Sequence, residues 1–280
     1  MKNLLLNKSL LYIILLLFIG YIRVGNSSVY NKGEIKKYKV TIEKEEQSSI
    51  DSNVPSRKTS RINFIIKEEV KETTLKHLIF NIEFDEMEVL FEERNYKIDL
   101  KNKVIRLTIT HEDNNFSFNN LDKIVNQNHL LKEMTLNEIF QYISKVIYQR
   151  LPNSKLSLGE KWMNLVGIFN PVNNKQVSIE HNMVIESSEI IQGFNCVRVS
   201  IKSKFPEGIE SLVDSDGITT EIQTTGKGDG YLFYDINTQR VVKYIFSISI
   251  DALCKTLIPQ GDTISLKANS SLNFNLELIK

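Results

Sequence analysis

The sequence predicts an α+β fold, in which large, curved antiparallel β-sheets form two β-rich halves with one or two helices between them. Three observations point to this fold. Long segments alternate between apolar and polar residues, most clearly Arg240–Ala252. A period of two indicates a sheet with one buried and one solvated face. Asn, Asp and Gly residues typical of turns separate these segments, and one capped helical segment divides them into two groups.

Residues 1–28 are expected to be a signal peptide. Lys2 and Lys8 form a short basic region, and the nearly continuous apolar run Leu10–Ile22 follows it. A run of about thirteen residues fits the apolar region of a signal peptide, whereas a membrane span needs about twenty. The small residue Ser27 fits a cleavage site. The predicted location is therefore periplasmic, extracellular or envelope-associated, and retention by an uncleaved leader is the alternative.

Residues 29–118 are assigned to an N-terminal β region. Its polar segment Ser48–Ser60 is expected to be an exposed loop. Alternating segments predict strands at 34–46, Arg61–Val70, Leu75–Phe84, Met87–Glu92 and Lys103–Thr110.

Residues 119–152 are predicted to be helical. Thr135 and Glu138 have the spacing of a capping box, in which each side chain satisfies a free backbone N–H of the first turn. A weaker helical segment at Leu121–Leu131 precedes it, and Pro152 ends the region. Apolar residues at helical spacing predict one buried face: Ile139, Tyr142, Ile143, Val146 and Ile147.

Residues 153–280 are assigned to a C-terminal β region, and residues 29–280 are expected to form one continuous domain. The predicted strands are Glu160–Val166, Gln176–Ser188, Phe194–Lys204, Ile218–Thr225, Gly228–Asp235, Arg240–Ala252 and Thr263–Ile279. Gly226, Gly228 and Gly230 invite a phosphate-loop interpretation, but such a loop precedes a helix and here a strand follows. We therefore expect a bulge or close packing at these glycines.

Cys196 and Cys254 are the only cysteines. An even number in an exported chain favours a disulfide between them. Two buried, unpaired thiols are the alternative, because spacing in the sequence does not give the geometry of a bond.

Charge and motifs exclude several functions. Without Lys2, Lys8 and Arg23, the 35 basic residues fall to 32 against 34 acidic ones, so no basic surface for nucleic acid is expected. The four histidines lack zinc-site spacing, and no G-x-S-x-G motif occurs. Asp214–Gly217 resembles the opening of a calcium loop but lacks its later ligands. We predict no enzyme activity and no catalytic, cofactor-binding or metal site.

Some motifs resemble those of a group of exported bacterial cell-envelope proteins without assigned activity. These proteins have a G-x-x-W element and a G-x-G…(F/Y)-D hairpin. The matching residues here are Gly159-Glu160-Lys161-Trp162, Gly226, Gly228, Tyr234-Asp235 and Val241-Val242, preceded by Leu151-Pro152. Gln239 departs from the pattern, which usually has a turn glycine there. The resemblance implies an envelope protein, and its plan is similar to the half-barrels of periplasmic lipoprotein carriers.

The expected function is non-enzymatic binding of a lipid or another apolar or amphipathic ligand on a concave sheet. The candidate ligand-facing residues are aromatic: Trp162, Tyr231, Phe233, Tyr244 and Phe246. Trp162 has a second interpretation, as an anchor of the core. One alternative function is a structural or adhesion module that acts through protein–protein contacts with a partner that the sequence does not identify. A hydrolase with a site assembled from distant residues is a further alternative.

Overall fold

The computed structural model describes residues 30–50, 56–74, 76–91, 93–110, 115–133, 140, 143–144, 146–148, 151, 156–170, 175–213, 218–257 and 263–279. Three predicted features lie outside these residues: the signal peptide, the capping box at Thr135 and Glu138, and the calcium-like segment Asp214–Gly217. Pro152 also lies outside them.

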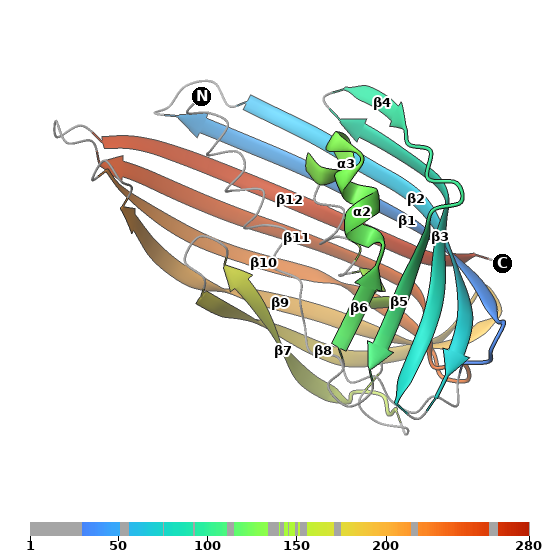
Figure 1. Cartoon of the computed structure of the whole chain (residues 1–280). Coiled ribbons are helices and arrows are strands. Elements are labelled where there is room, and N and C mark those ends of the chain that lie inside the picture. Colours follow the sequence, from blue (N-terminus) through green and yellow to red (C-terminus); the bar gives the residue numbers. More distant parts are fainter. Residues whose placement is uncertain are drawn as a thin grey trace.

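Twelve strands and two short helices make up the described structure (Figure 1). The N-terminal strands are β1 (Ile35–Ile50), β2 (Ser56–Thr73), β3 (His77–Phe91), β4 (Arg94–Lys97), β5 (Val104–Thr110) and β6 (Asn115–Asn119). The helices are α2 (Leu121–Asn126) and α3 (His129–Glu133). The C-terminal strands are β7 (Lys161–Asn170), β8 (Lys175–Ile191), β9 (Phe194–Val213), β10 (Thr219–Asp235), β11 (Arg240–Leu257) and β12 (Thr263–Ile279).

All these strands belong to one antiparallel sheet, which curls around the helices (Figure 1). Its order is β6-β5-β3-β2-β1-β12-β11-β10-β9-β8-β7, and β4 pairs with β3 beside this path. The two predicted β regions are thus joined edge to edge where the first strand pairs with the last, from Lys37↔Ile279 to Ile50↔Leu266. Among the described strands β6 and β7 do not pair with each other, so the sheet is open. Because the helices are so minor, the label α+β fits only loosely.

The predicted antiparallel strands are present, but several are longer than the alternation suggested. The strand β3, from His77 to Phe91, joins the two predicted strands Leu75–Phe84 and Met87–Glu92 into one, and its register against β2 shifts between Ile65 and Ile66. The extra residue at this bulge reverses the parity of the buried positions. The alternation in the sequence is interrupted there, so it predicted two strands in place of one. The predicted loop Ser48–Ser60 is largely strand, since β1 continues to Ile50 and β2 begins at Ser56.

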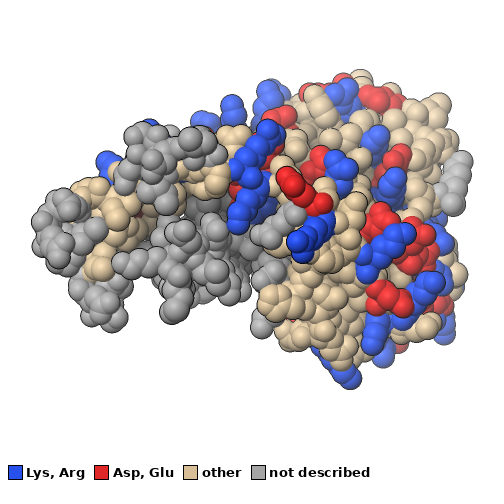
Figure 2. Space-filling view, turned by 90° about the horizontal axis from the view of Figure 1, so that it is seen from above, with Lys and Arg blue, Asp and Glu red and all other residues tan. Residues whose placement is uncertain are grey.

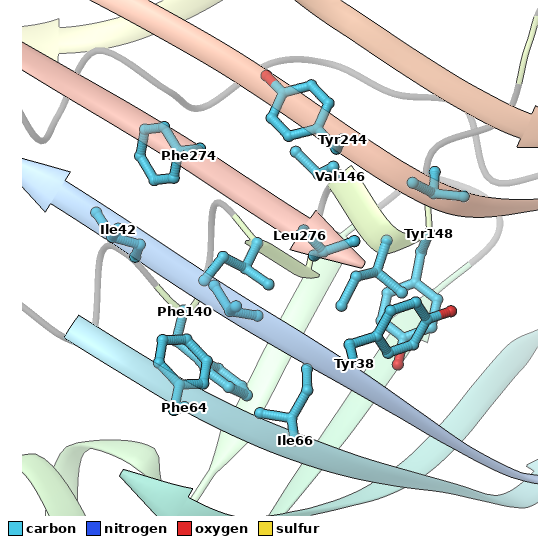
Figure 3. Close-up of a cluster of buried hydrophobic side chains, with 14 of the residues drawn as sticks. Tyr38, Ile42, Phe64, Ile66, Phe140, Val146, Tyr148, Tyr244, Phe274 and Leu276 are labelled. Atoms are coloured by element: carbon cyan, nitrogen blue, oxygen red, sulfur yellow. The ribbon is translucent and has the colours of Figure 1, made fainter. Parts of the chain in front are cut away.

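One face of the sheet carries the core, and it is the concave face that holds the helices. The described residues 140, 143–144 and 146–148 are buried there, and Phe140 and Tyr148 pack through their aromatic rings. The Phe140 ring lies 5.4 Å from that of Phe84, and the Tyr148 ring lies 4.5 Å from that of Phe80. Figure 3 shows these helical side chains among residues of β1, β2, β11 and β12. We call this side of the sheet the core face and the other side the outer face.

The visible surface in Figure 2 carries basic and acidic side chains interspersed, in keeping with a formal net charge of +1 for the whole chain. None of the described helices has the length and apolarity required to cross a membrane.

Candidate functional site on the core face

Strand register places six residues in one row across the core face of the C-terminal half. In order they are Lys44 on β1, Leu272 on β12, Ile248 on β11, Gly228 on β10, Ser203 on β9 and His181 on β8. At a strand spacing of ~4.8 Å the row follows the sheet for roughly 24 Å. It lies four residues further along β11 than Tyr244. The row and its neighbours form the candidate site.

The middle of this row is an apolar floor. Ile248, Ile250, Leu272 and Phe246 are all buried. The Phe246 ring stacks on Tyr244 at 5.8 Å and lies over β10, where the absence of side chains at the glycines makes room for it. Four apolar side chains from two adjacent strands therefore form a continuous hydrophobic cluster.

Lys44 and Glu46 form a partly buried ion pair at one end of the row, with side chains 10% and 28% exposed. Both lie on the core-face side of β1, where the preceding residues at the same parity, such as Ile42, are apolar. The Lys44 side chain is only 10% exposed, and its Nζ contacts the Glu46 carboxylate. Burial lowers the pKa of Lys44, and the Glu46 carboxylate opposes that shift. Lys58 lies opposite Glu46 on β2, so a second ammonium group neighbours this ion pair.

His181 and Ser203 form a polar pair at the other end of the row. The Ser203 Oγ lies 2.9 Å from His181 Nδ1, and the histidine ring lies 6.1 Å from that of Phe246. Burial lowers the pKa of His181 to about 4, so the imidazole is neutral at pH 7. Its buried Nε2 has no hydrogen-bond partner among the described residues. A neutral imidazole that hydrogen-bonds through Nδ1 retains a second polar nitrogen for another group.

A buried charge cluster holds the opposite end of the core together. Arg240 at the start of β11 donates from Nη1 to Glu68 Oε1 at 3.4 Å and from Nη2 to Glu34 Oε2 at 2.5 Å. Tyr148 donates its hydroxyl to Glu68 Oε2 at 2.5 Å. The cluster joins both halves of the sheet to the helical residues. It therefore fixes the helical residues at this end of the core face.

The five predicted ligand-facing aromatics do not share a face. Tyr244 and Phe246 lie on the core face, and Trp162 joins them because it pairs with the buried Met183. Tyr231 lies on the outer face, since its neighbours along β10 carry the buried positions. Phe233 has the same parity, but it is partly buried and packs against the core cluster next to a register shift. The Arg198 guanidinium stacks 3.8 Å from the centre of the Tyr231 ring. A single concave surface formed by all five side chains is thus ruled out by the alternation of the strand.

Cys196 and Cys254 are both free and buried, so the predicted disulfide is wrong. Cys196 pairs with Asp235 and Cys254 pairs with Ile222, positions at opposite ends of β10. Strand geometry places such positions roughly 40 Å apart along the chain, against a Cα separation of at most ~7 Å in a disulfide.

The glycines of β10 have the structural role expected of them. Gly226, Gly228 and Gly230 are paired with strands on both sides, and the register with β9 is irregular between Thr224 and Gly226. A Cβ at Gly228 would lie 2.8 Å from Phe246 Cζ. They form no phosphate loop. In the described part of the chain, no three His, Cys, Asp or Glu residues gather in a way that could hold a metal ion.

The outer face also has a hollow, of about 340 Å³, near the far ends of β1, β10, β11 and β12. Exposed polar side chains line it, among them Gln47, Gln223, Lys267 and the hydrogen-bonded pair Asn269 and Asp251. Solvent reaches these groups without a ligand. The core-face site differs because its polar groups are partly or fully buried.

Sequence reasoning missed Lys44, Glu46, His181 and Ser203. The signal was present in the alternation: Lys44 and Glu46 occupy the parity at which Tyr38, Val40 and Ile42 are buried. A charged residue at a core-facing strand position indicates either a strand end or a functional group, and the strand continues to Ile50. The pairing of His181 with Ser203 depends on register, which one strand's sequence does not specify.

No protein-family model matches this chain, and no curated protein matches it. Among solved structures, the chain is similar to a Salmonella typhi OmpF complex with daunomycin, at 6% sequence identity and a TM-score of 0.21. That match covers 86% of this chain and 98% of the other. A TM-score of this size carries no argument about fold or function.

Proposed function

We propose that the protein is an exported, non-enzymatic cell-envelope protein that binds an amphipathic ligand on the core face of its C-terminal half-sheet. The observation that carries the proposal is the cross-sheet row, in which an apolar floor lies between two partly buried polar pairs. The floor suits a hydrocarbon segment, and each pair offers polar groups to the ends of a ligand.

The buried polar groups are poorly explained by stability alone. Replacing a buried ion pair by apolar residues is often neutral or stabilising, because the pair loses its hydration. A buried, unpaired donor or acceptor costs about 1–3 kcal/mol. Lys44 with Glu46 and the Nε2 of His181 therefore weigh against the folded state, and a bound ligand with polar groups would offset that cost.

The pair His181 and Ser203 favours binding over catalysis. A serine nucleophile needs a base that a third group orients, and the base must reach the reacting atoms. Here Ser203 is only 4% exposed, and no described residue hydrogen-bonds the Nε2 of His181. A hydrogen-bonding role toward a ligand fits this geometry better.

Native mass spectrometry of the purified, detergent-free protein is the direct test, together with displacement of a fluorescent fatty acid. Ile250→Glu places a carboxylate on the floor and is expected to weaken probe binding at least about tenfold. Ile245→Glu, on the outer face of the same strand and 38% exposed, is the matched control and should bind normally. Both variants need unchanged circular dichroism. Equal binding by both would refute the core-face site.

A second candidate is a structural or adhesion module that acts through protein contacts. The observation in its favour is the open sheet, whose end strand β7 runs for ten residues with Lys161 as its one charged side chain. Such an edge can pair with another strand. A protein isolated without any bound small molecule, and captured through β7, would favour this function over the first.

A further inference from the structure

We infer that the ligand is an anionic amphiphile, whose head group binds Lys44 and Lys58 at the far ends of β1 and β2. The inference rests on the proposed function and specifies its ligand class. It comes from a change in the chemistry of the core face along these two strands.

The core face of β1 and β2 changes from apolar to polar between one cross-strand pair and the next. Before this level the paired residues are buried and apolar, such as Ile42 opposite Ile62. Beyond it the paired residues are polar: Lys44 with Ser60, Glu46 with Lys58, and Ser48 with Ser56. The hydroxyls of the last pair lie 3.1 Å apart. A polar head group would find charged and neutral hydrogen-bonding groups in this region.

The neighbouring strands remain apolar at the same level. Leu272 on β12 pairs with Lys44, and Ile248 on β11 pairs with Leu272. Both side chains are buried, as is Ile250. A molecule with its head group at Lys44 would therefore direct its tail toward the apolar floor, and it would have to displace the groups that now bury these side chains. The polar residues on β1 and the apolar residues on β12 lie on adjacent strands. The polarity of the core face therefore changes over the width of one strand, as it does between the head group and the tail of an amphiphile.

The charge of this polar region is positive. Glu46 and Lys58 are the charged neighbours whose fields act on Lys44. Two ammonium groups against one carboxylate leave an excess of one positive charge. An ammonium has three N–H donors, and Glu46 is the one acidic partner of Lys44 among the described residues. A carboxylate or phosphate head group would neutralise the excess charge and accept the remaining donors.

Binding should be measured by calorimetry with laurate, dodecyl phosphate, dodecanol and dodecylammonium, which share one tail, and with acetate and inorganic phosphate, which have none. We expect the two anionic amphiphiles to bind at least about tenfold more tightly than dodecanol, and dodecylammonium to bind most weakly. Acetate and phosphate alone should not bind. If inorganic phosphate bound as tightly as dodecyl phosphate, the site would be one for a free anion and the inference would fail.

The charge variants are expected to change the affinity for laurate in opposite directions, whereas general damage to the fold would lower the affinity in each of them. Lys44→Met should weaken laurate binding at least about tenfold, and Glu46→Gln should strengthen it by removing the competing carboxylate. Lys58→Gln, at an exposed position, tests the charge without disturbing the core and should also weaken laurate binding. Lys39→Met, on the outer face of β1, is the control and should change nothing. Dodecanol binding should be the same in all four.

The outcomes separate the inference from the function on which it rests. If none of the four amphiphiles binds the wild-type protein, the proposed function itself fails. If all four bind alike and the lysine variants leave their affinities unchanged, the protein binds amphiphiles but the anionic head-group site is refuted.

Discussion

Arg240 and Glu68 are 172 residues apart in the sequence, yet they face each other in the core with side chains 2% and 1% exposed. Arg240 begins β11 and Glu68 lies in β2, so this contact spans the junction between the two halves of the sheet. Burial raises the pKa of Glu68, and the nearby Arg240 guanidinium opposes that shift. The guanidinium also lies 4.4 Å from the centre of the Tyr30 ring. Glu68 has no exposed route to solvation and depends on Arg240 for a cation, whereas Arg240 also pairs with the partly exposed Glu34.

Arg240→Met should therefore destabilise the protein by about 3–5 kcal/mol, because Glu68 would remain buried without its cation. Urea denaturation measures the change. The double variant Arg240→Met with Glu68→Gln removes both charges and should recover most of the loss. Arg57→Met removes an exposed partner of Glu45, its side chain being 63% exposed, and should cost less than about 1 kcal/mol. Equal losses for the two single variants would contradict the role given to the buried pair.

Substitutions at two glycines of β10 should destabilise the protein, and a second substitution at Phe246 should rescue only one of them. In Gly228→Ala the new Cβ would meet the Phe246 ring at 2.8 Å, and in Gly230→Ala it would meet the Ile245 carbonyl oxygen at 2.1 Å. Each should destabilise, Gly228→Ala by about 1–3 kcal/mol. A smaller side chain, Phe246→Leu, should rescue Gly228→Ala but not Gly230→Ala, whose obstacle is backbone.

The same denaturation experiments decide the glycine prediction. Asp229→Ala, an exposed outer-face residue between the two glycines, should stay within about 0.5 kcal/mol of wild type. If Phe246→Leu rescued both glycine variants equally, the Ile245 carbonyl would not be the obstacle at Gly230.

Gln239 occupies a position that the sequence pattern had already marked as unusual. It lies in the turn between β10 and β11 with φ of +52°, in the left-handed region that glycine adopts without a steric penalty. Asp235 stabilises the same turn by accepting hydrogen bonds from the backbone N–H groups of Asn237 and Thr238. Gln239→Gly should therefore raise the free energy of unfolding by up to about 1 kcal/mol. Asn237→Gly is the control, because its φ is not positive, and should lower stability slightly.

The sequence predicted what depends on local alternation. Thr263–Ile279 has the predicted bounds, because its buried positions keep one parity from Ala268 to Leu278. It did not predict the pairing of β1 with β12, since contacts between the ends of a chain leave no local trace. The sequence-based prediction split β3 into two strands at the bulge near Asp85, where the buried positions change parity. It also assumed that the aromatic residues of β10 and β11 share one face of the sheet.

The candidate site could be found only in part. Tyr244 and Phe246 were recognised as a one-sided aromatic surface, and they do lie on the core face. The row from Lys44 to His181 needs five successive strand registers, each fixed by packing across the whole sheet. The disulfide failed for the same reason, because the positions of Cys196 and Cys254 along neighbouring strands depend on register.

His181 makes the stability of the protein depend on pH in a defined direction. Its pKa is about 4 in the folded protein against 6.5 for the free side chain. Between these values the unfolded chain binds more protons, so stability falls as the pH falls from 6.5 toward 4. The full contribution of His181 to this loss is roughly 3 kcal/mol. Glu68 acts in the opposite direction, since its raised pKa lets the fold gain stability as the pH falls toward 4.5.

The contribution of His181 is isolated by comparison with His181→Gln, which retains a hydrogen-bonding partner for Ser203 but does not titrate. Urea unfolding should be followed at intervals from pH 7.5 to pH 4 for both proteins. Because Glu68 and every other group are common to the two, the difference between their curves reports His181 alone. We expect the wild type to lose stability relative to the variant as the pH falls below 6.5, and the curves to run parallel above it. Parallel curves over the whole range would mean that His181 is protonated freely in the fold, and hence that it is not buried beside the apolar floor.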